Sequence, residues 1–170
     1  FDRLTPVRPT LTRAYAHGLS LYRRLAFKGG KHLNAWLLHN GEEDCQSLGA
    51  AGPIDPELLA IGFENEDGQV IGMLVSYALH ACSRGGHGNH SSPDSPGALA
   101  RDLRDHFGPD LVALFLPAAG GNLNPVLPRD ETGAALARHI VEGWPRRRPV
   151  DLAAGGLAVA SSSLVLPLRN

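Results

Sequence analysis

The chain has 170 residues, enough for one domain with a buried core, and its 43% hydrophobic and 19% charged residues are typical of a folded protein. The formal net charge of −1 lacks the basic excess of nucleic-acid-binding proteins, so we expect no nucleic-acid partner. No apolar run reaches the roughly 18 residues of a membrane span. The two cysteines, Cys45 and Cys82, fit no CxxC metal or redox pattern and neither demand nor exclude a disulfide.

The N-terminal third predicts little regular structure. Residues 14–27 have a mixed pattern that fits either a strand or an irregular segment, and residues 32–52 predict a loop. Two prolines within residues 52–57 predict a rigid turn, because each proline fixes its own φ and restrains the residue before it. A short strand is predicted at 58–63, and Asp67-Gly68 predicts a turn into the next strand.

An apolar run over residues 70–80 is the central feature of the chain. It has the length of a strand and is nearly unbroken, which favours a strand buried on both faces of a sheet. His80 ends this run, and a glycine-rich polar loop follows it. Ligands of open α/β sheets bind just beyond the strand ends, so His80 is a candidate site residue.

The second half alternates helix and strand. Helices are predicted at 97–107, with Asp94 as a candidate cap, and at 132–144; strands are predicted at 111–116, 157–159 and 163–166. This order predicts a single α/β domain over residues 1–170, with a mostly parallel or mixed sheet and flanking helices.

Polar side chains follow two of the predicted strands, His80 after one and Asn122 and Asn124 after the other. If these strands are neighbours, the loops line one cleft, where Asn124 or a backbone N–H of residues 120–121 donates to a developing oxyanion. The alternative is that residues 120–125 are only a turn, because Gly, Asn and Pro are the usual turn residues.

Two further patterns, an arginine pair and a group of three histidines, each have both a functional and a purely structural interpretation. Arg23 and Arg24 form a pair that is either a solvated surface or a forked hydrogen-bond donor for a carbonyl or carboxylate. The histidines 80, 87 and 90 suggest a three-histidine zinc site, but their spacing matches no recognised metal motif, which favours solvated loop histidines.

Several segments, taken in order, resemble the N-terminal domain of the neutral/alkaline non-lysosomal ceramidase family, especially its bacterial branch. They are Gly-Pro-Ile-Asp-Pro-Glu at 52–57, Phe-Glu-Asn-Glu-Asp-Gly at 63–68, Tyr-Ala-Leu-His at 77–80, Ser-Pro-Asp-Ser-Pro-Gly at 92–97 and the segment 115–125. Together with Tyr22-Arg23-Arg24 they cover most of the chain.

The resemblance implies a zinc amidohydrolase that cleaves the N-acyl bond of a ceramide-like lipid or another small amide through metal-activated water. It makes His80 a zinc ligand and Arg23 the residue that holds the amide oxygen. Asn124 occupies the position of the family's active-site serine. The implied partner is a small amphiphilic or lipid substrate, met at a membrane surface, and the family is compatible with a secreted or periplasmic location.

The sequence departs from the family in two respects. Asn124 replaces the serine, and the family's other zinc ligands, a His-x-His segment and later Glu and Tyr residues, would lie before residue 1 and after residue 170. The chain is therefore expected to be the middle part of a larger catalytic domain. A catalytic zinc needs about three protein ligands, so we expect this chain alone to bind zinc weakly. The alternative is a non-catalytic remnant or binding module that lacks a complete metal site.

Overall fold

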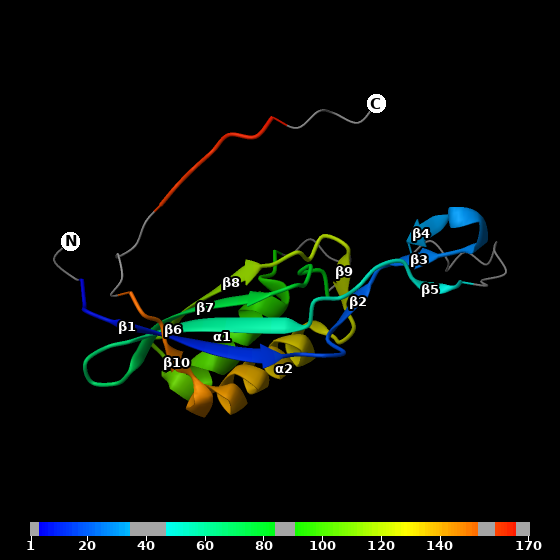
Figure 1. The fold of residues 1–170 in the computed structure, drawn as a ribbon. Helices are drawn as coiled ribbons and strands as arrows, with labels where there is room; N and C mark the ends of the chain where they lie inside the picture. Colours follow the sequence, from blue (N-terminus) through cyan, green and yellow to red (C-terminus); the bar gives the residue numbers. More distant parts are fainter. Residues whose placement is uncertain (1–3, 35–46, 84–90, 153–158, 166–170) are drawn as a thin grey trace.

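The computed structural model describes residues 4–34, 47–83, 91–152 and 159–165 (Figure 1). A five-stranded sheet in the order β10-β1-β6-β7-β8 forms the body of the molecule. Two helices, α1 (Asp94–Phe107) and α2 (Arg129–Gly143), pack against it. The strands of this sheet are β1 (Arg8–Tyr15), β6 (Glu57–Glu64), β7 (Val70–Tyr77), β8 (Val112–Pro117) and β10 (Arg148–Pro149).

Two small sheets and two short helices complete the described fold. One sheet is a ribbon of β2 (Ser20–Tyr22) and β9 (Leu123–Pro125). The other contains β3 (Arg24–Ala26), β4 (His32–Asn34) and β5 (Gly49–Ala50), and it projects from one end of the body in Figure 1. Single-turn 3-10 helices lie at η1 (Lys28–Gly30) and η3 (Trp144–Arg146).

The predicted α/β class is confirmed, and the sheet is mixed. β7 and β8 are parallel and are joined through α1, whereas β10–β1, β1–β6 and β6–β7 are antiparallel pairs. The turn predicted at Asp67-Gly68 explains the last of these, since a short turn can join only antiparallel strands. Gly68 has a φ of +80° there, and its N–H donates to the Asn65 carbonyl at 3.0 Å.

The core lies between the helices and one face of the sheet. Alternate residues of β6 and β7 point into it and are buried, and they meet the apolar stripes of α1 and α2. The core includes Leu58, Met73, Val75, Leu99, Leu103, Leu136 and Ile140. On the other face Val112, Leu114 and Leu116 of β8 remain 59%, 55% and 47% exposed. In the predicted central strand β7, Leu74 and Ser76 on this other face are only half-buried, so the expectation that this strand is buried on both faces is wrong.

Other differences from the sequence-based expectations concern the weakly patterned segments. β1 was not predicted as a separate strand, and residues 32–52 contain β4 and β5 in their described part. Both helices begin three residues before their predicted starts, at Asp94 and Arg129. Residues 159–165 contain no strand, which contradicts the strand expected at 163–165; positions 157, 158 and 166 lie outside the described residues. None of the helices in the described ranges is long and apolar enough to cross a bilayer.

An ion pair between Glu64 and Arg147 connects the end of β6 to the segment after α2. The Arg147 guanidinium donates to Glu64 through Nε at 2.7 Å and Nη2 at 2.9 Å, and the Thr10 hydroxyl donates to the same carboxylate at 2.9 Å. Arg147 also lies over the Trp144 ring, 4.7 Å from its centroid. The hydrogen bond from Arg147 lowers the pKa of Glu64 below its ordinary value, although burial opposes this.

Glu64→Gln tests this ion pair through the pH dependence of stability. Because the folded-state pKa of Glu64 is lowered, its contribution is present above the unfolded-state pKa and is lost as the pH falls through the folded-state pKa. We expect the variant to lower the free energy of unfolding by about 1–2 kcal/mol at pH 7. The two proteins should converge once the pH falls below the folded-state pKa of Glu64. Urea unfolding over a series of pH values measures this, and a difference that does not change with pH would contradict it.

A close approach between two strand ends is tested by Gly120→Ala. A Cβ on Gly120 would lie 2.9 Å from the backbone of Leu79, so the loop after β8 must move away from the end of β7. We expect a loss of about 1–3 kcal/mol in the free energy of unfolding, as for other overpacked positions. Gly121→Ala is the matched control, because nothing lies within 4 Å of its added Cβ. Equal unfolding free energies of the two variants would contradict the close approach.

Candidate functional site

The loops after β7 and β8 meet at one edge of the sheet. The last rung of the parallel pair joins Tyr77 to Pro117, and the Ala118 N–H donates to the Tyr77 carbonyl at 3.2 Å. Beyond the strands, the His80 N–H donates to the Leu123 carbonyl at 3.1 Å. The structure therefore brings His80 next to the segment that carries Asn124, as the idea of one shared cleft requires. The His80 side chain is exposed and follows the end of β7 by three residues.

The β2–β9 ribbon holds Arg23 and Asn124 together. Asn124 faces Leu21 in the antiparallel register, and the Arg23 N–H extends the ladder by donating to the Asn122 carbonyl at 2.9 Å. Asn124 is only 4% exposed, whereas Arg23 is half-buried. The alternative that residues 120–125 are only a turn holds for residues 121–122, whereas Asn124 belongs to strand β9 and its side chain is enclosed.

The phenol of Tyr77 fixes this ribbon to the main sheet. Tyr77 is fully buried, and its hydroxyl donates to the Ala16 carbonyl at 2.8 Å. Since that proton is engaged, the Ser20 hydroxyl is the donor in its 3.4 Å contact with the Tyr77 oxygen. Burial raises the pKa of Tyr77, so the phenol stays protonated and able to donate.

Buried polar atoms without partners occur in and beside the ribbon, in the loop after β7 and at the start of α1. Five side-chain atoms of the described residues are buried without a hydrogen-bond partner, and one of them, Thr12 Oγ1, belongs to β1. The other four are Arg23 Nε, Ser83 Oγ, Ser95 Oγ and Asn124 Nδ2. Native proteins rarely leave such groups unpaired, so a cluster of them indicates a place where a ligand supplies the partner. Arg23 Nε and Asn124 Nδ2 are donors, which points to a ligand with acceptor oxygens.

A cavity of about 380 Å³ opens beside Asn124. Its polar lining comes from Cys82, Ser83 and Asn124. The remaining lining is largely apolar and consists of Leu21, Pro125, Val126, Leu127 and Pro128. The volume falls within the usual range of small-molecule pockets, about 300–1,000 Å³. Neither His80 nor Arg23 belongs to the described lining of this cavity.

Cys82 is a site residue that the sequence analysis did not identify. It is a free thiol whose Sγ donates to Asn124 Oδ1 at 3.7 Å. Burial raises the pKa of Cys82, the Asp94 carboxylate raises it further, and the positive charge of Arg23 acts in the opposite direction. Arg23 and Asp94 thus both lie within electrostatic range of the cavity wall. The position of Cys82, two residues after His80, was the only available signal.

Asp94 joins the start of α1 to the same loop. It is 7% exposed, and its Oδ1 accepts hydrogen bonds from the N–H groups of Ser95 at 2.7 Å and Ser83 at 3.2 Å. Its φ of +51° is in the left-handed region, which non-glycine residues seldom occupy. The sequence anticipated Asp94 as a cap just before a helix at 97–107. Instead it is the first residue of the helix and holds the backbone of the Cys82 loop.

The described residues do not assemble a metal site. No group of three or more His, Cys, Asp or Glu side chains within the described ranges is arranged to hold a metal ion. His80 is the candidate ligand among them, and His87 and His90 lie outside the described residues, as does Cys45. The residues present therefore do not fit a complete zinc site by themselves.

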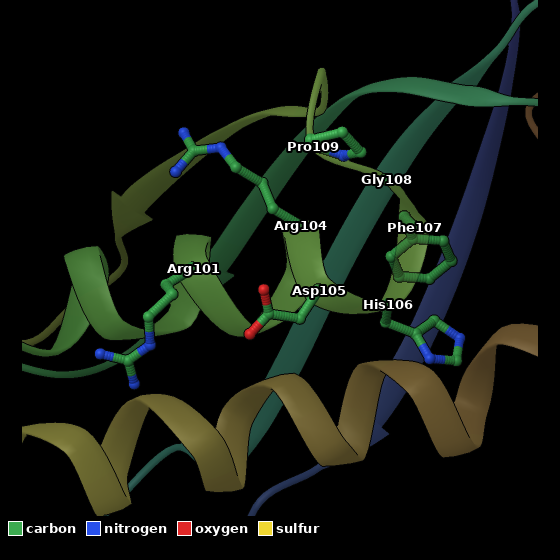
Figure 2. Close-up of a pocket in the computed structure, with 7 residues that line it drawn as sticks. All are labelled: Arg101, Arg104, Asp105, His106, Phe107, Gly108 and Pro109. Atoms are coloured by element: carbon green, nitrogen blue, oxygen red, sulfur yellow. The ribbon is translucent and has the colours of Figure 1, made fainter.

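A second and larger cavity lies at the C-terminal end of α1 (Figure 2). It has a volume of about 600 Å³ and is lined by the last turns of α1 and the loop after it. Its arginines are already engaged, since Arg101 pairs with Asp102 and Asp130, and Arg104 Nε donates to the Leu111 carbonyl at 3.0 Å. None of the unpartnered buried atoms of the described residues is in its lining, so we regard it as a surface hollow.

Two solved structures share the fold of this chain. Neutral ceramidase from Pseudomonas aeruginosa matches with a TM-score of 0.63 and 21% sequence identity, over 85% of this chain and 24% of that chain. A structure described as ceramidase complexed with C2 matches with the same TM-score, identity and coverage of this chain, over 23% of its own length. No protein-family model and no curated protein matches the sequence. The chain thus spans about a quarter of the ceramidases that it resembles, and it has a ceramidase-like fold.

Proposed function

We propose that this chain forms part of a zinc-dependent amide hydrolase that cleaves the N-acyl bond of a ceramide-like lipid or another small amphiphilic amide. The observation that carries the proposal is the pair of buried donors without partners, Arg23 Nε and Asn124 Nδ2, beside a cavity with largely apolar walls. The fold shared with neutral ceramidases supports the same reaction class by analogy.

In this proposal the donors bind the oxygen of the scissile carbonyl. When an amide is attacked, negative charge develops on that oxygen, and donors already in place stabilise the charge without having to reorganise. Asn124 supplies an amide N–H, and the Arg23 guanidinium supplies positive charge next to the cavity wall. The apolar walls around Leu21 and Leu127 would accept the acyl chain of an amphiphilic substrate, which the protein would meet at a membrane surface.

Asn124 cannot itself be the nucleophile. An asparagine amide has no ionisable proton and forms no acyl ester of the kind that a serine forms. A carboxamide can still donate to the oxyanion. The attacking group would therefore be water, and Asn124 would act only as a donor.

The proposed cofactor is zinc, with His80 as its ligand from this chain. Other ligands would come from outside the described residues, because no group of three or more His, Cys, Asp or Glu side chains within these residues is arranged to hold a metal ion. Zinc, when bound, lowers the pKa of its water toward about 7. The contribution of the described residues is to hold His80 at the end of β7 through its backbone bond to Leu123, and to place Asn124 beside it.

A second candidate function is a binding module without catalysis. Asparagine at position 124, where the ceramidase family has serine, favours it. Such a module would use the same two donors and the same cavity to hold an acyl ligand. It would release that ligand unchanged.

Asn124→Ala in the full-length protein separates these functions. Removing one oxyanion donor should lower kcat for an N-acyl fluorogenic amide by about 10²–10³-fold and leave the zinc content unchanged. Asn124→Ser should keep part of the activity, because a hydroxyl also donates.

Arg23→Ala should lower kcat as well, and Arg24→Ala is its matched control because the neighbouring Arg24 is exposed. Rates with substrate, and metal analysis of each variant, give these values.

Two results would remove Asn124 from the proposed mechanism. One is an unchanged kcat in Asn124→Ala, and the other is a trapped acyl-enzyme at this position. If no amide is cleaved but dodecanoate binds, and binds more weakly to Asn124→Ala, the binding module is the correct function. Failure of both hydrolysis and dodecanoate binding would remove both proposals.

A further inference from the structure

Cys82 has no part in the proposed chemistry, although it lines the same cavity as Asn124. Its Sγ donates to Asn124 Oδ1 at 3.7 Å. This contact joins residues that are far apart in the sequence, Cys82 in the loop after β7 and Asn124 in strand β9. A second observation accompanies it, because Asn124 is 96% buried (4% exposed) and its Nδ2 has no partner.

The contact determines which end of the Asn124 amide is available. An asparagine side chain has an acceptor oxygen and a donor nitrogen, and rotation by half a turn exchanges the two. With Oδ1 held by the thiol, Nδ2 is the end of the amide that has no partner. In the opposite orientation Nδ2 would face the sulfur, which is a poor acceptor, and the oxygen would repel a ligand oxygen. The thiol therefore favours the orientation that donates.

We propose that Cys82 is a positioning residue that holds the Asn124 amide with its N–H groups toward the ligand oxygen. The catalytic consequence rests on the proposed function, whereas the orientation of the amide does not. No covalent step of the sulfur is involved. A ligand that presents a carbonyl or carboxylate oxygen would then meet a donor that is already oriented.

Three substitutions of Cys82 in the full-length protein separate the hydrogen bond from simple packing. Cys82→Ala removes both the donor and the volume, Cys82→Val keeps an apolar side chain without a donor, and Cys82→Ser keeps a donor. We expect Ala and Val to lower kcat about 3- to 10-fold with little change in KM, as for the loss of one neutral hydrogen bond. Ser should restore most of the rate. Restoration by Val and not by Ser would overturn the proposal.

A double-mutant cycle tests whether Cys82 acts through Asn124. In the Asn124→Ala background, Cys82→Val should cause no further loss of kcat, because the group that the thiol orients is already absent. Equal losses in both backgrounds would show a structural role only and would overturn the proposal. Thermal unfolding of each variant identifies any that fail to fold, and the Ser and Val variants keep the test decisive if Ala does not fold.

The orientation is also measured without turnover, so the test does not depend on hydrolase activity. In protein labelled with ¹⁵N at asparagine, the side-chain NH₂ signals of Asn124 are assigned by their loss in Asn124→Ala. We expect these signals to shift or broaden in Cys82→Val and to stay close to wild type in Cys82→Ser. Unchanged Asn124 signals in Cys82→Val would overturn the proposal even if the protein hydrolyses amides. The expected changes in a protein without amidase activity would keep the positioning role and reject only the proposed reaction.

Discussion

The buried phenol of Tyr77 is the constraint on which the site depends. β7 is a central strand of a regular sheet, but Asn124 and Arg23 belong to a ribbon of only three residues on each strand. Such a short ribbon has few backbone hydrogen bonds of its own. The Tyr77 hydroxyl, through Ala16 and Ser20, ties the segment that enters the ribbon to the end of the sheet. Because all three residues are buried, these hydrogen bonds form away from the competition of water.

Several local features of the site are unfavourable to folding by themselves. Buried donors at Arg23 and Asn124 lack partners, and Asp94 occupies the left-handed region of backbone space. Each feature costs free energy, typically about 1–3 kcal/mol. The rest of the described fold is regular, with an alternating sheet and two amphipathic helices that supply the compensating burial. A concentration of such costs at one edge of a sheet is the usual signature of a site under functional rather than structural constraint.

The parts of the fold that were predicted from the sequence are those with strong local patterns. The apolar runs of β7 and β8, the stripes of α1 and α2 and the turn at Asp67-Gly68 each have a period or a turn residue that specifies their type. The mixture of parallel and antiparallel strands was harder to predict. The alternation of helix and strand gives no information on β1, whose partners β6 and β10 are distant in the sequence. The ribbon strands β2 and β9 are too short for any period, and they exist because tertiary hydrogen bonds support them.

The residues of the candidate site also differ in how far the sequence predicted them. His80 was predicted because it ends a long apolar run, and Asn124 was predicted because it lies in the polar segment that follows the second apolar run. The proximity of the two loops required the pairing of β7 with β8, which the sequence could suggest but not establish. Cys82 had no signal beyond its position two residues after His80, because its contact with Asn124 of β9 exists only in the folded structure. Arg23 was noticed for its charge, but its burial depends on the ribbon.

The three-residue ribbon also has a consequence for the order in which the molecule folds. Its two strands are separated by most of the chain, so closing that long loop costs conformational entropy that only three residue pairs offset locally. We therefore expect the ribbon to form after β6, β7 and the two helices have packed together. The cavity beside Asn124 is then completed in a late step. A molecule that binds in the completed cavity binds the folded protein and not the unfolded chain. Its binding free energy therefore stabilises the fold, and the protein with the molecule bound unfolds at a higher temperature than the protein without it.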